Sequence, residues 1–190
     1  MAKVEGFETD FNYRTPVQGL RVYGAAAYNR ARYDSFPGAP CYNGQTPAQG
    51  CNIVGGNPTQ NLADKPVARS PKLNLSGGAT LDMPIGASMK LGLTGGVTHS
   101  SSYLTDTTGA PNGRQPRYTL LDGSIRLGAE DDRWQLALIG RNLTNEFYYV
   151  ASADVPFTGT GTAAGSLGDR FASVSRGREV MIQASFKFGN

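Results

Sequence analysis

The C-terminal segment alternates strictly between apolar and polar side chains. Its apolar positions are Val180, Ile182, Ala184, Phe186 and Phe188, and its intervening positions are Glu179, Met181, Gln183, Ser185 and Lys187. Because successive side chains of a β-strand point to opposite faces, this segment has one apolar face and one largely polar face. Such a strand is typical of the wall of a transmembrane β-barrel, and it also suits the closing strand of a soluble sandwich or barrel. The rest of the chain has to distinguish the two.

Seven segments in total show this two-residue period, and no helical period competes with them. They span residues 3–14, 20–36, 71–83, 87–99, 117–129, 133–148 and 179–188. In the third segment, for example, Leu73, Leu75 and Leu81 alternate with Asn74, Ser76 and Asp82. The pattern predicts an all-β chain of about seven antiparallel strands.

The connections between these segments alternate in length. Those at 15–18, 84–86 and 130–132 are short, whereas those at about 37–70, 100–116 and 149–175 are long. This alternation is typical of up-and-down transmembrane barrels, which have tight periplasmic turns and long outer loops. Structureless connections of that length are also uncommon in compact soluble domains. We therefore expect an incomplete transmembrane barrel. The alternative, a soluble β-sandwich binding module, predicts that the apolar faces of 73–81 and 89–97 are buried against protein.

Composition excludes several other classes. The 18 Lys and Arg residues against 15 Asp and Glu are scattered, so we expect no nucleic-acid partner. No segment approaches the roughly 20 apolar residues of a membrane helix. Residues 1–6 lack the apolar stretch of a signal peptide. Cys41 and Cys51 lie in one segment rich in Gly, Pro and Asn, which favours a loop disulfide in an oxidising compartment over a metal site.

The sixth and seventh segments resemble a known family. Trp134, Leu136 and Leu138 precede the run Asn142-Leu143-Thr144-Asn145 and then Tyr148, and this order is similar to the penultimate strand of TonB-dependent outer-membrane receptors. The final strand of that family resembles residues 176–188, which include Phe186 and Phe188. Gly6-Phe7-Glu8 is similar to its mid-barrel turn and strand. We interpret the Asn residues as structural, because Asn side chains bond free backbone groups where a strand ends.

The resemblance implies a barrel of about 22 strands filled by an N-terminal plug that contacts TonB. Residues 1–190 would then be the C-terminal portion of the barrel, without plug or signal peptide. The expected location is the bacterial outer membrane, and the expected partners are outer-membrane lipid, the missing barrel strands and the plug. TonB would act only through that absent plug. The implied function is uptake of a scarce nutrient such as siderophore-bound iron or a glycan, with no cofactor.

Several loop residues are candidates for ligand contact because they combine aromatic and cationic chemistry. They are Arg114, Arg117, Tyr118, Tyr148, Tyr149 and Arg170.

An enzymatic alternative rests on His99 and Ser101, which lie two residues apart where the fourth segment ends. A similar pair occurs in outer-membrane phospholipases, but no Asn is clearly placed to orient the imidazole. The glycine-rich stretch at 159–165 lacks the Lys-Ser/Thr of a phosphate loop. Asp106 and Asp154 are too sparse for a calcium site. We therefore expect neither enzyme activity nor a metal site.

Overall fold

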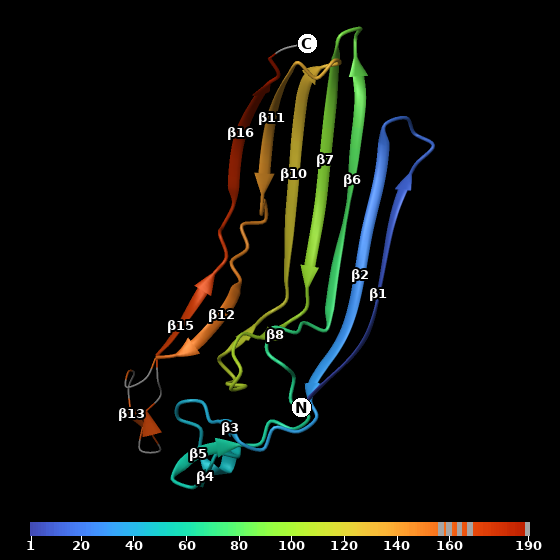
Figure 1. Ribbon diagram of the computed structural model, residues 1–190. Helices are drawn as coiled ribbons and strands as arrows, with labels where there is room; N and C mark the ends of the chain where they lie inside the picture. The colour runs from blue at the N-terminus through green and yellow to red at the C-terminus, as the bar shows by residue number, and fades with distance from the viewer. Residues whose placement is uncertain (156–157, 159–160, 163–164, 167–168, 189–190) are drawn as a thin grey trace.

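One antiparallel sheet of seven long strands dominates the computed structural model, which describes residues 1–155, 158, 161–162, 165–166 and 169–188. Each strand pairs with its neighbours in chain order, as Figure 1 shows. The strands in order are β1 (Ala2–Arg14), β2 (Leu20–Tyr33), β6 (Leu73–Ile85), β7 (Met89–Ser100), β10 (Tyr118–Ala129), β11 (Trp134–Arg141) and β16 (Glu179–Phe186). The predicted all-β, up-and-down architecture is confirmed.

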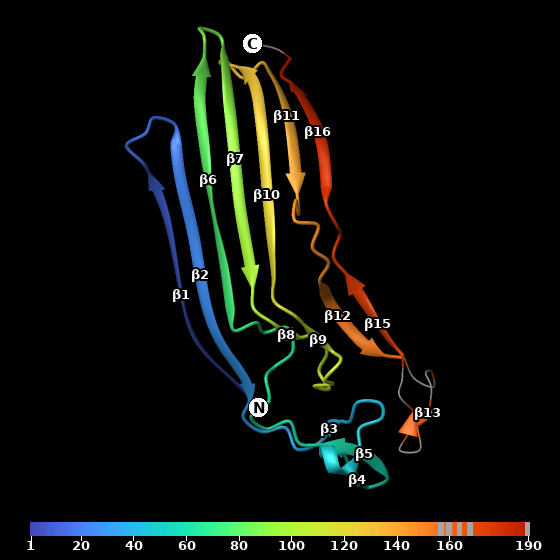
Figure 2. The same ribbon diagram turned by 180° about the vertical axis from the view of Figure 1, so that it is seen from behind.

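The connections divide between the two ends of the sheet. The short turns lie at the end that carries the C-terminus, here called the turn end, and the long connections lie at the opposite end, the loop end (Figures 1 and 2). The sequence predicts structureless long connections, and this prediction is wrong, because the connections contain short strands and a turn. The first long connection contains a three-stranded sheet of β3 (Ala39–Pro40), β5 (Asn57–Gln60) and β4 (Asn52–Val54), and a 3₁₀ turn at Pro47–Gln49. The second contains the pair β8 (Tyr103–Leu104) and β9 (Arg114–Gln115). The third contains the pair β12 (Tyr149–Asp154) and β15 (Arg170–Val174) and the pair β13 (Gly161–Thr162) and β14 (Gly165–Ser166).

The strand register gathers apolar side chains on one face of the sheet. One row across six strands consists of Leu20, Leu81, Leu93, Ile125, Leu138 and Ile182, each directly paired with the next. We call the surface that carries this row the apolar face. Ile125 remains 53% exposed and Ile182 77% exposed, so no second layer covers them within the described residues. The soluble-sandwich alternative, which requires a buried face, is therefore wrong for this sheet.

The opposite surface, here called the polar face, carries hydroxyl and charged groups. Arg126 on β10 reaches across β7 and donates from Nη2 to Oδ1 of Asp82 on β6, at 3.2 Å. Gly92 is the residue of β7 that lies between them in register. A Cβ at Gly92 would lie 2.8 Å from Asp82 Oδ1 and 2.9 Å from Arg126 Nε, so the missing side chain leaves room for the ion pair.

Among the described residues, no helix combines the length and apolar character needed to cross a membrane.

The two edges of the sheet are β1 and β16, and both run in the same direction (Figure 1). An odd number of antiparallel strands leaves the edges parallel, so they are not matched for the usual antiparallel closure. Neither edge strand has a second partner within the described part of the chain. Each edge therefore presents unpaired N–H and C=O groups.

We predict that residues 1–190, refolded alone in detergent, associate through these edges instead of giving a closed monomer. The physical reason is that each unpaired backbone group costs several kcal/mol in hydrocarbon. Light scattering at several protein-to-detergent ratios measures the mass of the protein in the complex. A monodisperse, heat-modifiable monomer at every ratio would contradict the prediction.

Candidate functional site

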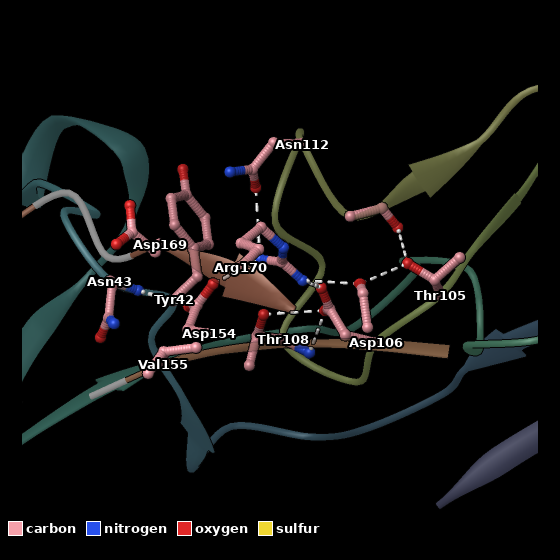
Figure 3. Close-up of polar contacts among 12 residues, drawn as sticks. Tyr42, Asn43, Thr105, Asp106, Thr108, Asn112, Asp154, Val155, Asp169 and Arg170 are labelled. Carbon is pink, nitrogen blue, oxygen red and sulfur yellow. Dashed lines mark hydrogen bonds and ion pairs between the residues drawn. The ribbon is translucent and has the colours of Figure 1, made fainter. Parts of the chain in front are cut away.

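The loop end of the sheet is organised around the guanidinium group of Arg170 on β15 (Figure 3). Its Nη1 donates to Oδ1 of Asp154 at 2.6 Å and to Oδ1 of Asn112 at 3.2 Å. Its Nη2 donates to Oδ2 of Asp106 and, at 3.0 Å, to Oγ of Ser152. The side chains of Arg170 and Asp106 are only 11% and 7% exposed, so this is a buried ion pair.

Both carboxylates also accept hydrogen bonds from loop backbone, Asp154 from another connection and Asp106 from its own. Asp154 accepts from the backbone amide of Asn43 at 2.9 Å, which ties β12 to the longest connection. Oδ1 of Asp106 accepts from the amide and hydroxyl of Thr108, each at 2.8 Å, and from the amide of Gly109 at 3.1 Å. Two long connections thus meet at the Arg170 guanidinium, and the longest connection joins them through Asp154. We call Arg170, Asp106 and Asp154 the loop clasp.

Further bonds support the loop clasp from either side. The buried hydroxyl of Thr105 donates to the carbonyl of Gly113 at 2.8 Å and lies 2.6 Å from Oγ of Ser152. Nε2 of Gln60 donates to the carbonyl of Thr108 at 2.8 Å. These bonds act together with the ion pairs in holding the loops in one arrangement.

The longest connection is also closed covalently. Cys41 and Cys51 form a disulfide with their Cα atoms 5.9 Å apart. Nε2 of Gln60 donates to the carbonyl of Pro40, the residue before Cys41, at 2.7 Å. The cross-link and this bond fix the segment that supplies Asn43 to the loop clasp.

The loop clasp changes the interpretation of three residues. The sequence makes Arg170 a candidate for ligand contact, but two carboxylates and two neutral side chains occupy its Nη1 and Nη2 atoms. Its buried Nε has no hydrogen-bond partner among the described residues. We interpret Arg170 as a residue that positions the loops. Asp106 and Asp154 were dismissed as too sparse for a calcium site, yet folding brings them to the same guanidinium. The cation that pairs with both carboxylates is the guanidinium group of Arg170. The described residues contain no group of three His, Cys, Asp or Glu side chains able to hold a metal.

An aromatic pair lies at the loop end of the sheet, where β10 begins. The rings of Tyr118, at the start of β10, and Tyr148 stack with centroids 4.1 Å apart and planes 5° apart. Tyr118 is in register with Ser100 and has the same parity as Asp122 and Ser124, which places it on the polar face. This stacked pair offers an apolar surface with hydroxyl groups at its edge, suited to a ligand that has its own flat apolar surface.

Tyr103 joins the aromatic pair to the next loop. Its hydroxyl donates to the carbonyl of Tyr149 at 2.8 Å. Burial, together with the neighbouring Tyr118 phenol, raises the pKa of Tyr103 to about 12. Tyr103 therefore stays protonated at neutral pH and keeps donating this bond.

The remaining candidates are less closely grouped. Arg114 on β9 is exposed, and its Nη1 donates to Oγ of Ser102 at 3.3 Å. Tyr149 on β12 is 45% exposed, and its backbone amide donates to Oε1 of Gln115 at 2.6 Å. Arg117 is exposed and takes part in no hydrogen bond or ion pair found among the described residues. The structure thus brings together Tyr118 and Tyr148, but not the whole candidate set.

The motif after β11 forms a turn instead of continuing the strand. The sequence predicts that this strand continues to residue 148, and this prediction is wrong. β11 ends at Arg141 because Asn142 and Asn145 take left-handed backbone conformations, with φ of 48° and 55°. Asn tolerates this region better than most residues do. Nδ2 of Asn142 donates to the carbonyls of Glu146 and Arg176, and Oδ1 of Asn145 accepts from the amide of Arg178.

The neighbours of this turn bind it to the sheet. The amide of Leu143 donates to the carbonyl of Leu121 at 2.7 Å, and the hydroxyl of Thr144 donates to the carbonyl of Thr119 at 3.1 Å. Trp134, Leu136 and Leu138 lie in register with Phe186, Ala184 and Ile182 on the apolar face. Phe188 lies beyond β16 and is almost fully exposed.

His99 and Ser101 have separate partners in the structure. Nδ1 of His99 lies 2.8 Å from the hydroxyl of Thr119, while Oγ of Ser101 accepts from the amide of Leu73 at 2.9 Å. No bond joins the two side chains among the contacts of the described residues. This arrangement lacks the base–nucleophile contact that a hydrolase requires. In the glycine-rich stretch, Gly159, Ala163 and Ala164 lie outside the described residues.

The architecture is that of a β-barrel wall with long loops at one end. The sequence matches the family described as TonB dependent receptor-like, beta-barrel, over residues 1–143. The chain belongs to this family. The matched range covers most of the chain and ends inside the Asn142–Asn145 turn, whereas the sequence motifs that resemble the family are most specific at 133–188. No curated protein matches the sequence.

Two solved receptors share the fold. The ferric yersiniabactin uptake receptor FyuA from Yersinia pestis aligns with a TM-score of 0.69 and 16% identity, over 99% of this chain and 24% of FyuA. The siderophore receptor PiuA from Acinetobacter baumannii aligns with a TM-score of 0.63 and 16% identity, over 96% of this chain and 21% of PiuA. The chain therefore spans about a quarter of the length of these receptors, and at this identity the likeness establishes the fold.

We predict that Arg170→Ala opens the loop clasp. It leaves Asp106 and Asp154 buried without their counter-charge, which costs about 3–5 kcal/mol for a buried pair. Hydrogen exchange at 105–113 and 149–154 should accelerate strongly, with little change in β6 and β7. Arg114→Ala is the matched control, because it removes an exposed arginine from a neighbouring loop segment. Equal protection of the loops in the two variants would refute the role of Arg170.

Proposed function

We propose that this chain forms the C-terminal part of the barrel wall of a bacterial outer-membrane receptor that imports a scarce nutrient. The observation that carries the proposal is the segregation of the sheet into one apolar and one polar face, with short turns at one end and long loops at the other. Membership of the receptor family supports it. The apolar face would contact outer-membrane lipid, and the polar face would line the interior.

Aromatic residues on the apolar face support a membrane location. Trp134 and Phe186 are paired near the turn end, and Phe7 and Tyr28 are paired near the loop end. Aromatic side chains are enriched at both membrane–water interfaces of transmembrane barrels. The exposed aliphatic row centred on Ile125 lies between these two levels and would face the hydrocarbon.

The stacked Tyr118–Tyr148 pair would contribute to ligand capture at the outer mouth, with Tyr149, Arg114 and Arg117 as further candidates. We infer that the ligand is an iron–siderophore complex, because FyuA is a receptor for ferric yersiniabactin uptake and PiuA is a siderophore receptor. A glycan is the alternative, since sugar rings also stack on aromatic side chains. Titration with ferric chelates and with oligosaccharides distinguishes the two ligand classes.

Energy for import would come from outside this chain. In the proposed receptor, further N-terminal barrel strands close the wall and a plug fills it, and TonB acts through that plug. No cofactor is required of these residues, and we propose a role in binding and transport, not catalysis.

We predict that Ile125→Arg destabilises the natural full-length protein containing these residues. Its free energy of unfolding in a bilayer should fall by about 2–4 kcal/mol, because the substitution places a charge at mid-depth on the lipid side. Ser124→Arg is the matched control: it adds the same charge at the same depth on the polar face and should cost far less. Urea unfolding in lipid vesicles, after detergent extraction has confirmed membrane insertion, measures both. Similar losses in the two variants would remove the face assignment.

We predict that Tyr148→Ala weakens ligand binding roughly three- to tenfold, because one half of the stacked pair is lost. The natural full-length protein containing these residues is titrated with ferric chelates and with oligosaccharides, and tryptophan fluorescence reports binding. Tyr13→Ala serves as the control, since Tyr13 is an exposed tyrosine at the turn end. Binding of oligosaccharides alone would overturn the siderophore assignment, and unchanged affinity in Tyr148→Ala would overturn the site.

A further inference from the structure

A basic pocket lies at the loop end of β2, away from the stacked tyrosines and the loop clasp. Arg30, Arg32 and Lys72 line it, together with Asp64 and Ser70, and it encloses about 330 Å³. Pairing of β2 with the following connection builds it: the amide of Asn29 donates to the carbonyl of Lys72 at 2.8 Å, and Arg32 forms a bridge with Pro66. We call Arg30, Arg32 and Lys72 the basic pocket.

The basic pocket begins where the apolar face ends. Tyr28 stacks on Phe7 with ring centroids 5.7 Å apart, and both rings lie on the apolar face. Arg30 and Arg32 follow Tyr28 at two-residue intervals, so strand alternation places them on the same face. Each interval advances about 6–7 Å along the strand. Two cations therefore lie directly beyond an exposed aromatic pair, along the direction that would leave the membrane.

The charges of the basic pocket are not balanced by their neighbours. Glu5 is opposite Arg30 in register, but it forms an ion pair with Lys3 at 2.7 Å. Asp64 is the one carboxylate among the residues that line the pocket. Among the contacts of the described residues, neither Arg30 nor Arg32 takes part in a side-chain hydrogen bond or ion pair. Within the described part of the chain, the two guanidinium groups are thus free of side-chain partners.

We propose that the basic pocket binds the phosphate group of an outer-leaflet lipid, whose acyl chains run along Phe7 and Tyr28. The planar guanidinium forks of Arg30 and Arg32 match phosphate oxygens in a bidentate manner. A soluble phosphate compound would use the cations but would gain nothing from the adjoining aromatic surface, and this favours the lipid. The inference rests on the proposed membrane location.

The test uses the natural full-length protein in nonionic detergent, with phosphatidic acid as the probe. Native mass spectrometry compares its retention with that of diacylglycerol of the same acyl chains, which lacks only the phosphate. The variant is Arg30→Gln/Arg32→Gln. The control is Arg21→Gln, which removes an arginine from the turn end of the same strand and the opposite face. Equal heat-modifiability of all proteins shows that folding is intact.

We expect retention of phosphatidic acid and not of diacylglycerol. Affinity should fall on the order of twentyfold in the double variant, since each surface cation contributes about fivefold, and it should change little in Arg21→Gln. Unchanged retention in the double variant would overturn the site. Displacement of the lipid by equal concentrations of inorganic phosphate or glycerol phosphate would overturn the lipid in favour of a soluble ligand. Because the assay is in detergent, failure of membrane insertion would be seen separately, in the extraction experiment.

Discussion

The antiparallel hydrogen-bond ladder sets the position of every other feature of this protein. In such a ladder, side chains that face each other across two strands lie on the same side of the sheet, and a slip of one residue would move a whole strand's apolar set to the other side. The row from Leu20 to Ile182 shows that all six of its strands keep one common register. The two-faced wall is a direct result of that agreement.

The same register also sets what the polar face and the loop end can do. It places Gly92 between Asp82 and Arg126, so that an ion pair crosses a strand, and it places Tyr118 on the polar face at the loop end. Because β2, β7 and β11 all end at the loop end, their long connections bring distant residues together there. The loop clasp joins Asp106, Asp154 and Arg170, which are 16 to 64 positions apart in sequence.

At the loop end, we assign different roles to the loop clasp and to the stacked tyrosines. A buried guanidinium with two carboxylates gives little net stability compared with apolar packing, but it penalises any arrangement that separates the charges. We interpret it as a device that fixes the loops in one geometry. In the proposed receptor, the Tyr118–Tyr148 pair would then present a constant surface, and this would lower the entropic cost of capturing a ligand.

The sequence alone determined the strands, their faces and the end to which each connection belongs, because a two-residue period and a turn's length are local properties. It also identified the family from a few motif residues. It extended the sixth strand too far, since the left-handed backbone of Asn142 and Asn145 depends on partners such as Arg176 and Arg178. Only the tertiary structure decided that Arg170 is bound by Asp106 and Asp154, and that Tyr118 stacks on Tyr148. Asp154 and Arg170 lie in one hairpin, but the other contacts join separate segments of the chain, and no local pattern records which segments will meet.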